Sequence, residues 1–87
     1  MYWAYILESQ KDKSWYIGYT SDLKNRLRDH NRGYGGATTS KNKDGWKLIY
    51  CEGYTNIQDA KGRERFLKSG AGRKYVKRQL INYLNKG

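Results

Sequence analysis

One acidic residue, Glu64, lies where an apolar side chain is expected. Ile57, Ala60, Glu64 and Leu67 follow one another at intervals of three, four and three residues, and on a helix over residues 56–69 they fall within an arc of about 80°. A carboxylate inside such an apolar stripe is costly unless a cation neutralises it. Two kinds of cation fit: a divalent metal ion, or a basic side chain of another element or of the same helix, where the candidates are Arg63, Arg65 and Lys68.

Arg26 and His30 form a second candidate pair. A Thr-Ser-Asp sequence at residues 20–22 can cap a helix that runs to about residue 31, and Leu23, Leu27 and His30 share one face of that helix. Arg26 lies three residues after Leu23 and four before His30. Arg26 and His30 therefore project side by side at the edge of the buried stripe. A capped or packed helix end is the alternative interpretation for His30.

The remaining pattern predicts the elements that position these residues. Residues 1–7 and 14–19 are rich in aromatic and β-branched side chains and are expected to form an antiparallel hairpin, with a third strand over residues 46–51. Helices are expected over 20–31, 56–69 and 73–84, a long loop over 32–45, and a break at Gly70-Ala71-Gly72. The fold class is therefore α+β, a small and mainly antiparallel three-stranded sheet with about three helices packed on it.

The charge of the chain indicates a negatively charged partner. Its 87 residues carry 18 Lys+Arg and 8 Asp+Glu, a formal net charge of +10. Residues 1–60 hold nine basic and seven acidic residues (9 − 7 = +2), whereas residues 61–87 hold nine basic residues and one acid, Glu64 (9 − 1 = +8). Such a field attracts polyanions. Nucleic acid is favoured, and the ribosome, an acidic lipid surface or solubility alone are the alternatives.

Composition excludes several other classes of protein. The length fits one small domain, which we expect to span residues 1–87, with no second catalytic domain. The single Cys51 excludes an internal disulfide and any Cys-rich zinc site. No apolar run approaches the ~20 residues of a membrane helix, and no signal peptide is apparent. The chain is expected to be cytoplasmic, with no membrane partner.

An ordered set of motifs resembles the GIY-YIG nuclease family. Tyr16-Ile17-Gly18 closes the second predicted strand, Arg26 follows eight residues later, His30 comes four after that, and the stretch AKGRERFLK at 60–68 carries Glu64. The resemblance covers roughly residues 2–80. It is greatest to short single-domain members that resemble the N-terminal nuclease domain of the excision-repair nuclease.

The resemblance implies a divalent-metal-dependent endonuclease that hydrolyses DNA phosphodiester bonds, with a structure-specific or repair role. Tyr5 matches the last residue of the first motif, although Trp3-Ala4 replaces Gly-Ile. Mg²⁺, or Mn²⁺, would be held by Glu64. Arg26 would offer its planar fork of donors to phosphate oxygens. The catalytic set implied by the resemblance is Tyr5, Tyr16, Arg26, His30 and Glu64.

Two of these implied roles remain open in detail. Either Tyr5 or Tyr16 could take the proton of the attacking water. A free tyrosine has a pKa of about 10, so it needs a nearby cation or hydrogen bonds to act as a base near neutral pH, and His30, Arg26 and the metal could supply these. Gly18 would let the backbone approach the metal or a phosphate, and a plain β-bulge is the alternative.

Substrate binding is expected from clustered basic residues, with DNA as the substrate and RNA as an alternative. The set is Lys41, Lys43, Arg63, Arg65, Lys68, Arg73, Lys74, Lys77 and Arg78. Competing hypotheses are a binding module that does not cut and a protein active only together with a partner protein. A third, a basic RNA- or ribosome-associated protein, predicts that the side chains of the matched residues do not converge.

Overall fold

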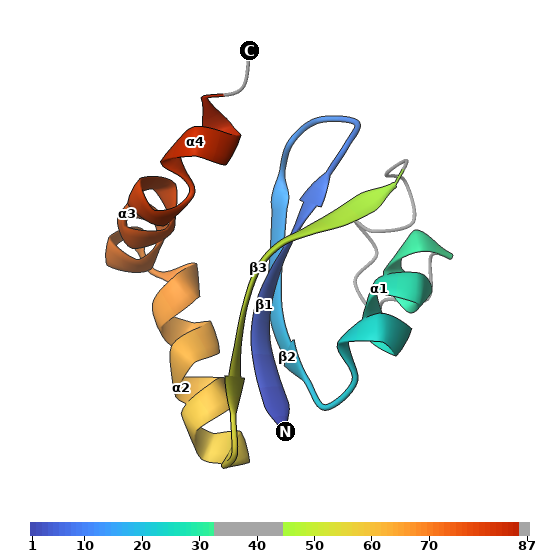
Figure 1. Ribbon diagram of the computed structural model, residues 1–87, viewed down its shortest axis with the longest axis vertical. Coiled ribbons are helices and arrows are strands. Elements are labelled where there is room, and N and C mark those ends of the chain that lie inside the picture. Colours follow the sequence, from blue (N-terminus) through green and yellow to red (C-terminus); the bar gives the residue numbers. More distant parts are fainter. Residues whose placement is uncertain (33–44, 86–87) are drawn as a thin grey trace.

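The structure, a computed structural model, describes residues 1–32 and 45–85. The predicted binding residues Lys41 and Lys43 lie outside the described residues. The elements of Figure 1 confirm the α+β class, and the described residues form four helices where about three were expected. In chain order they are β1 (Tyr2–Ser9), β2 (Trp15–Thr20), α1 (Leu23–Asn31), β3 (Trp46–Tyr54), α2 (Ile57–Lys68), α3 (Gly70–Gln79) and α4 (Ile81–Leu84).

The three strands form one antiparallel sheet in the order β2-β1-β3. β1 is the central strand. Its first two residues are half-buried, and every residue from Ala4 to Ser9 is buried, because helices cover both faces of the strand. β2 is an edge strand whose register with β1 runs without interruption and places Tyr5 directly opposite Gly18. The pairing of β1 with β3 shifts between Ile6 and Leu7. The regular register excludes the β-bulge that was an alternative for Gly18.

Alternation along β1 divides the core into two layers. Ala4 and Ile6 pack against Leu67 of α2 and Val76 of α3, whereas Tyr5 and Leu7 form a second cluster with Trp46, beneath α1. Figure 1 shows the sheet edge-on, with α2 and α3 on one side and α1 on the other. A site that uses residues of both layers must therefore combine side chains from the two faces of the sheet.

The C-terminal helices differ from the prediction in their bounds. The Gly70-Ala71-Gly72 sequence does not break the chain but forms the first turn of α3. The break comes one residue earlier, at Ser69, whose hydroxyl donates to the Phe66 carbonyl and accepts from the Gly72 N–H. A Cβ at Gly72 would overlap the Phe66 carbonyl. Gly72 is thus required by the close approach of two helices.

Two further boundaries were wrong in detail. The predicted helix over 73–84 is divided at Leu80, where φ is −105° and ψ is 27°. The third strand extends past Cys51 to Tyr54, which lies opposite Tyr2 at the start of β1. By contrast, the first helix is capped as predicted, because the Asp22 carboxylate accepts the Asn25 N–H at 3.1 Å.

Candidate active site

Tyr5 and Gly18 form the centre of the candidate site. A Cβ placed on Gly18 would lie 2.7 Å from Tyr5 Oη and 3.3 Å from Tyr16 Cε1. The ring of Tyr5 therefore extends across the space that a side chain at Gly18 would fill. Since β2 is the edge strand, the Tyr5 hydroxyl points toward the free edge of the sheet. In the structure, the group that approaches the Gly18 backbone is a phenol.

Tyr16 links this centre to the end of α1. Its ring centroid lies 6.5 Å from that of Tyr5 and 4.3 Å from that of His30, which is 1% exposed. The His30 ring in turn lies 5.9 Å from that of Trp46. Asn31 fixes this end of α1, because its side-chain oxygen accepts the Trp46 N–H at 2.5 Å and its amide donates to the Trp46 carbonyl at 3.3 Å.

The surroundings of His30 favour its neutral form. Burial lowers the pKa of the imidazole, the nearby positive charge of Arg26 lowers that pKa further, and Asp29 opposes the shift. Within the described residues, neither ring nitrogen has a hydrogen-bond partner. Of the two ways in which His30 could assist a tyrosine, a hydrogen bond is therefore favoured over a positive charge. A neutral imidazole instead offers one acceptor and one donor.

Three of the other matched groups act electrostatically on Tyr5. Burial raises the pKa of the Tyr5 phenol, Tyr16 and Glu64 raise it further, and Arg26 lowers it. Three charged or ionisable groups from β2, α1 and α2 thus act on the hydroxyl of a residue that is 2% exposed. The hypothesis of an RNA- or ribosome-associated protein, which predicts that these side chains do not converge, is less favoured by this arrangement.

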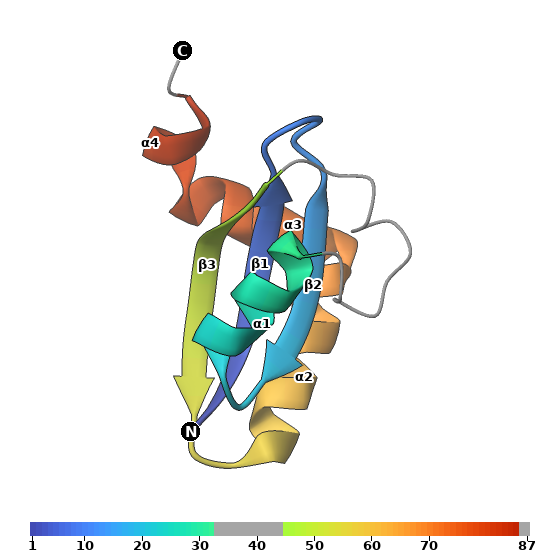
Figure 2. The same cartoon turned by 90° about the vertical axis from the view of Figure 1, so that its right-hand side faces the viewer.

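Glu64 reaches this centre from the opposite layer. Figure 2 shows α2 behind the sheet and extending past the edge strand β2, with α1 in front. Glu64 is 13% exposed at its side chain, and its Oε2 lies 2.7 Å from Lys68 Nζ. The predicted pairing with a basic residue of the same helix is therefore confirmed. Lys68 is 57% exposed, and a pair of this kind contributes only about 0.3–0.5 kcal/mol.

The donor set around Glu64 fits one kind of metal ion. Residues 1–32 and 45–85 contain no group of three or more His, Cys, Asp and Glu side chains that could hold an ion by themselves. Zinc, which takes three or four protein ligands, does not fit this arrangement. Mg²⁺ does, because it commonly binds through one or two carboxylates and completes its shell with water and substrate phosphates.

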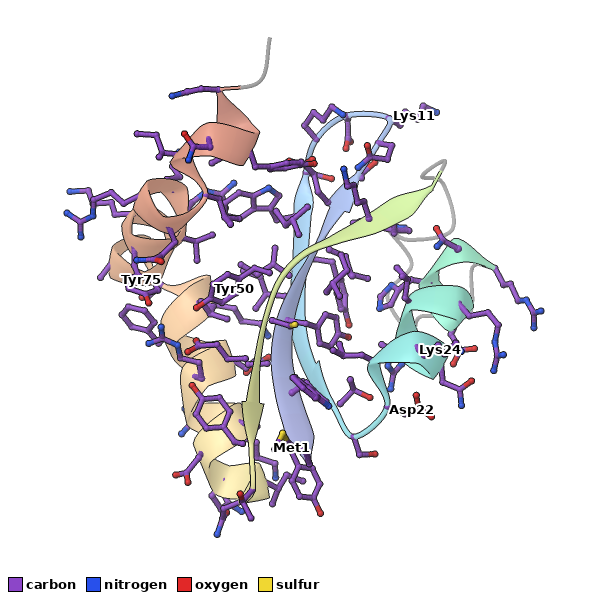
Figure 3. The ribbon with its side chains drawn as sticks, in the orientation of Figure 1. Met1, Lys11, Asp22, Lys24, Tyr50 and Tyr75 are labelled. Carbon is purple, nitrogen blue, oxygen red and sulfur yellow. The ribbon has the colours of Figure 1, made fainter. Side chains whose placement is uncertain are left out.

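Arg63 is placed differently from the other predicted binding residues. Its Nε donates to Glu52 Oε1 at 2.6 Å, and its guanidinium lies 4.8 Å from the ring of Tyr75. The Tyr50 hydroxyl donates to the same Glu52 oxygen at 2.7 Å. We call these four residues the structural cluster. Figure 3 shows Tyr50 and Tyr75 beside α2 and α3, on the far side of the sheet from Lys24 on α1. Arg63 is committed to packing, which argues against a role in substrate binding.

The other described members of the binding set lie on two helices, α2 and α3: Arg65, Lys68, Arg73, Lys74, Lys77 and Arg78. Sequence reasoning missed Lys61, whose Nζ lies 5.7 Å from the ring of Tyr19, and Trp15, whose ring lies 4.6 Å from the Arg73 guanidinium. The signal for Lys61 was its spacing, three residues before Glu64 and therefore on the same side of the helix.

The two residues that replace Gly-Ile in the first motif both make packing contacts. A Cβ on Gly53 of β3 would lie 2.8 Å from Trp3 Cζ3, so the Trp3 ring covers that glycine. Ala4 is fully buried and packs with α2 and α3. Both replaced positions therefore contribute to packing, and Tyr5, the third position of the motif, lies at the centre of the candidate site.

Comparison with known proteins identifies the family. The GIY-YIG catalytic domain model matches residues 1–77. The chain is 41% identical over 66 residues to a UPF0213 protein of Streptococcus pneumoniae, covering 76% of this chain and 65% of that protein. The UPF0213 protein YsiG of Lactococcus lactis is 36% identical over 92 residues, covering 95% and 86% of the two chains. The match to the Streptococcus protein thus spans just under two thirds of that relative's own length.

A solved structure shows the same fold. The solution NMR structure of the UPF0213 protein BH0048 from Bacillus halodurans is 33% identical to this chain, with a TM-score of 0.52 over 100% of this chain and 88% of that one. Among the described residues, no helix has the length and apolar character needed to cross a membrane.

Proposed function

This chain belongs to the GIY-YIG catalytic domain family, a nuclease family, and we propose that it is a divalent-metal-dependent endonuclease that hydrolyses phosphodiester bonds of DNA. One observation carries the proposal. Tyr16, Arg26 and Glu64, from three different elements, act electrostatically on the buried hydroxyl of Tyr5. The structure-specific or repair role and the cytoplasmic location stay predictions.

Glu64 and Arg26 have complementary roles in this proposal. Glu64 would hold Mg²⁺, which when bound polarises phosphate oxygens and offsets the charge that develops on them. Arg26 is partly buried, and within the described residues it forms no ion pair with a carboxylate. Its donors are therefore free to bind two phosphate oxygens. Phosphoryl chemistry depends chiefly on this kind of positioning and charge stabilisation.

The two tyrosines are suited to different tasks. Because burial and the neighbouring Tyr16 and Glu64 raise the pKa of Tyr5, its phenol stays protonated near neutral pH and can donate a hydrogen bond to a phosphate oxygen. Tyr16, as its phenolate, is then the candidate for accepting the proton of the attacking water. The water oxygen bonds to phosphorus as the P–O bond to the leaving oxygen breaks, and the leaving oxygen takes a proton from solvent. Neutral His30 packs on the Tyr16 ring and is the group placed to orient it.

A cleavage assay with isosteric variants tests the proposal. Purified protein is incubated with plasmid and branched DNA in Mg²⁺, in Mn²⁺ or in EDTA. We expect metal-dependent nicking that is lost in Glu64→Gln and in Arg26→Lys. Asp59→Asn is the matched control, because Asp59 is an exposed acid on the same helix. Nicking that persists in Glu64→Gln at the level of Asp59→Asn contradicts the assignment.

A second experiment separates true inactivity from a missing partner. If no DNA substrate is cut, tagged protein is purified from its source cells and the assay is repeated with the co-purified fraction. Cleavage that appears only there, and that Glu64→Gln abolishes, identifies a nuclease that needs a partner protein. Metal-independent DNA binding without cleavage in either preparation identifies a binding module.

A further inference from the structure

Two cation–aromatic pairs lie along the free edge of the sheet. Among the described strands, β2 is bonded only to β1, and its alternate side chains, Trp15 and Tyr19, face the layer of α2 and α3. The Arg73 guanidinium lies 4.6 Å from the Trp15 ring centroid, and Lys61 Nζ lies 5.7 Å from that of Tyr19. The catalytic roles proposed above use neither pair. Their placement on one edge nevertheless relates them to the site.

The two pairs flank the candidate site. On α2, Lys61 comes three residues before Glu64, and the chain then turns into α3, where Arg73 lies. In Figure 2 both helices lie behind the sheet, and α2 runs along β2. The order along the edge is therefore the Tyr19 pair, then Glu64, then the Trp15 pair. The four residue steps from Trp15 to Tyr19 span about 13 Å, at about 3.3 Å per residue.

The chemistry of this edge favours unpaired bases. Aromatic rings and guanidinium planes stack on exposed bases of single strands, whereas a duplex presents mainly its phosphates. Tyr19 is 38% exposed and is one of three large exposed hydrophobic residues in the described chain. Among the described strands, none pairs with the outer side of β2, so backbone donors and acceptors of this edge face outward there. Because the flanking side chains are cationic and α3 contains no acidic residue, a polyanion fits this edge better than a partner β-strand.

We propose that the free edge of β2 binds an unpaired stretch of DNA, with the Tyr19–Lys61 and Trp15–Arg73 pairs each stacking on bases on either side of the bond to be cut. The location of that bond rests on the proposed endonuclease function, but the binding does not. The substrate class is then a single strand, flap or gap, and not a continuous duplex.

Binding is measured by fluorescence anisotropy in EDTA, so that cleavage does not interfere. The probes are a labelled oligothymidine and a hairpin duplex of the same charge. We expect the single strand to bind about tenfold more tightly than the duplex, and Tyr19→Leu and Arg73→Lys each to weaken single-strand binding about fivefold or more. Arg73→Lys keeps the charge and removes the stacking plane. Lys24→Ala, on the exposed surface of α1, removes a charge elsewhere and should change affinity by less than about twofold.

Specific results overturn the inference. Equal affinity for duplex and single strand, wild-type binding by Arg73→Lys in a folded protein, or no DNA binding at all would each contradict it. A parallel Mg²⁺ cleavage assay separates the two proposals. Single-strand binding that both variants weaken, without cleavage of any DNA, retains this inference and refutes the endonuclease. Cleavage that is indifferent to both variants retains the endonuclease and refutes this inference.

Discussion

The structural cluster and the candidate site contain nearly the same residue types but differ in how their polar groups are paired. The structural cluster and the candidate site each contain two tyrosines, one arginine and one glutamate. In the structural cluster, a single oxygen of Glu52 accepts hydrogen bonds from both the Arg63 guanidinium and the Tyr50 hydroxyl. Its polar groups thus satisfy one another, and they join β3 to α2.

The candidate site leaves its polar groups incompletely satisfied. Glu64 is paired with an exposed lysine, and the buried His30 nitrogens have no partner within the described residues. Buried polar groups are normally hydrogen-bonded, and exceptions need an explanation. In our proposal, a bound metal ion completes the contacts of Glu64, and His30 orients Tyr16. Residue type therefore does not distinguish the two regions, whereas the completeness of internal pairing among the described residues does.

The largest expected effect lies in the activity of the candidate site. Glu64→Gln should reduce DNA cleavage by about 10²–10³-fold, since removing one group that stabilises transition-state charge costs this much. Its free energy of unfolding should change by less than about 0.5 kcal/mol, because the ion pair that is lost is with an exposed lysine. Plasmid nicking rates and urea unfolding of the same preparation measure both quantities. A loss of stability that matches the loss of activity would mean that Glu64 is structural.

The corresponding variant of the structural cluster should lower the free energy of unfolding more than it lowers the cleavage rate. Glu52→Gln leaves the Arg63 guanidinium without its charged acceptor in a half-buried position, which should lower the free energy of unfolding by about 1–3 kcal/mol. Cleavage at a temperature well below the unfolding midpoint should stay within about threefold of wild type, since the structural cluster lies apart from the Tyr5 hydroxyl. Thermal and urea unfolding, with Asp59→Asn as the control, measure this effect. Unchanged stability would remove the contrast between the two regions.

The sequence predicted the position of Glu64 but not the role of its neighbour Arg63. Helical periodicity placed Glu64 on an inward face, and the side chain is indeed mostly buried. Arg63 and Arg65 look equivalent in a helix, and only tertiary structure separates them, because the partner of Arg63 lies on β3. The same limit applies to the glycines of the α2–α3 junction. They are breakers by local propensity, yet Gly72 is required by contact with the Phe66 carbonyl.

The interaction of Glu64 on α2 with Tyr5 in the sheet could not be predicted from the sequence either. Glu64 and Tyr5 belong to different layers, and alternation along a strand says only which face each residue takes. Their electrostatic interaction depends on β2 being an edge strand and on Gly18 leaving space for the Tyr5 ring. The family resemblance supplied the identity of these residues, and the strand order supplied the physical reason that they meet.

A pH-dependent loss of stability should follow from His30, the only histidine in the chain. Its pKa is lowered from 6.5 in the folded protein. Below about pH 6.5, His30 therefore binds a proton more readily in the unfolded chain than in the folded one. Stability that is present above this pH should therefore decline as the solution is acidified toward about pH 5. The urea midpoint of wild type should fall over this range, and that of His30→Phe should be nearly constant. A parallel fall in both proteins would assign the effect to other groups.

The smallest expected effect is that of Lys68→Ala, and it depends on the difference between two ion pairs of nearly equal length. Glu64 and Lys68 are 2.7 Å apart, and Glu52 and Arg63 are 2.6 Å apart, but the Lys68 side chain is 57% exposed and that of Arg63 is 23% exposed. Lys68→Ala should therefore cost only about 0.3–0.5 kcal/mol of stability. Because the metal no longer has to displace the lysine from the carboxylate, the Mg²⁺ concentration for half-maximal cleavage should fall by about twofold. Titration of Mg²⁺ against initial cleavage rate, with Lys74→Ala as the control for lost charge, measures the shift. A higher Mg²⁺ requirement in Lys68→Ala than in Lys74→Ala would show that the lysine assists the carboxylate and does not compete for it.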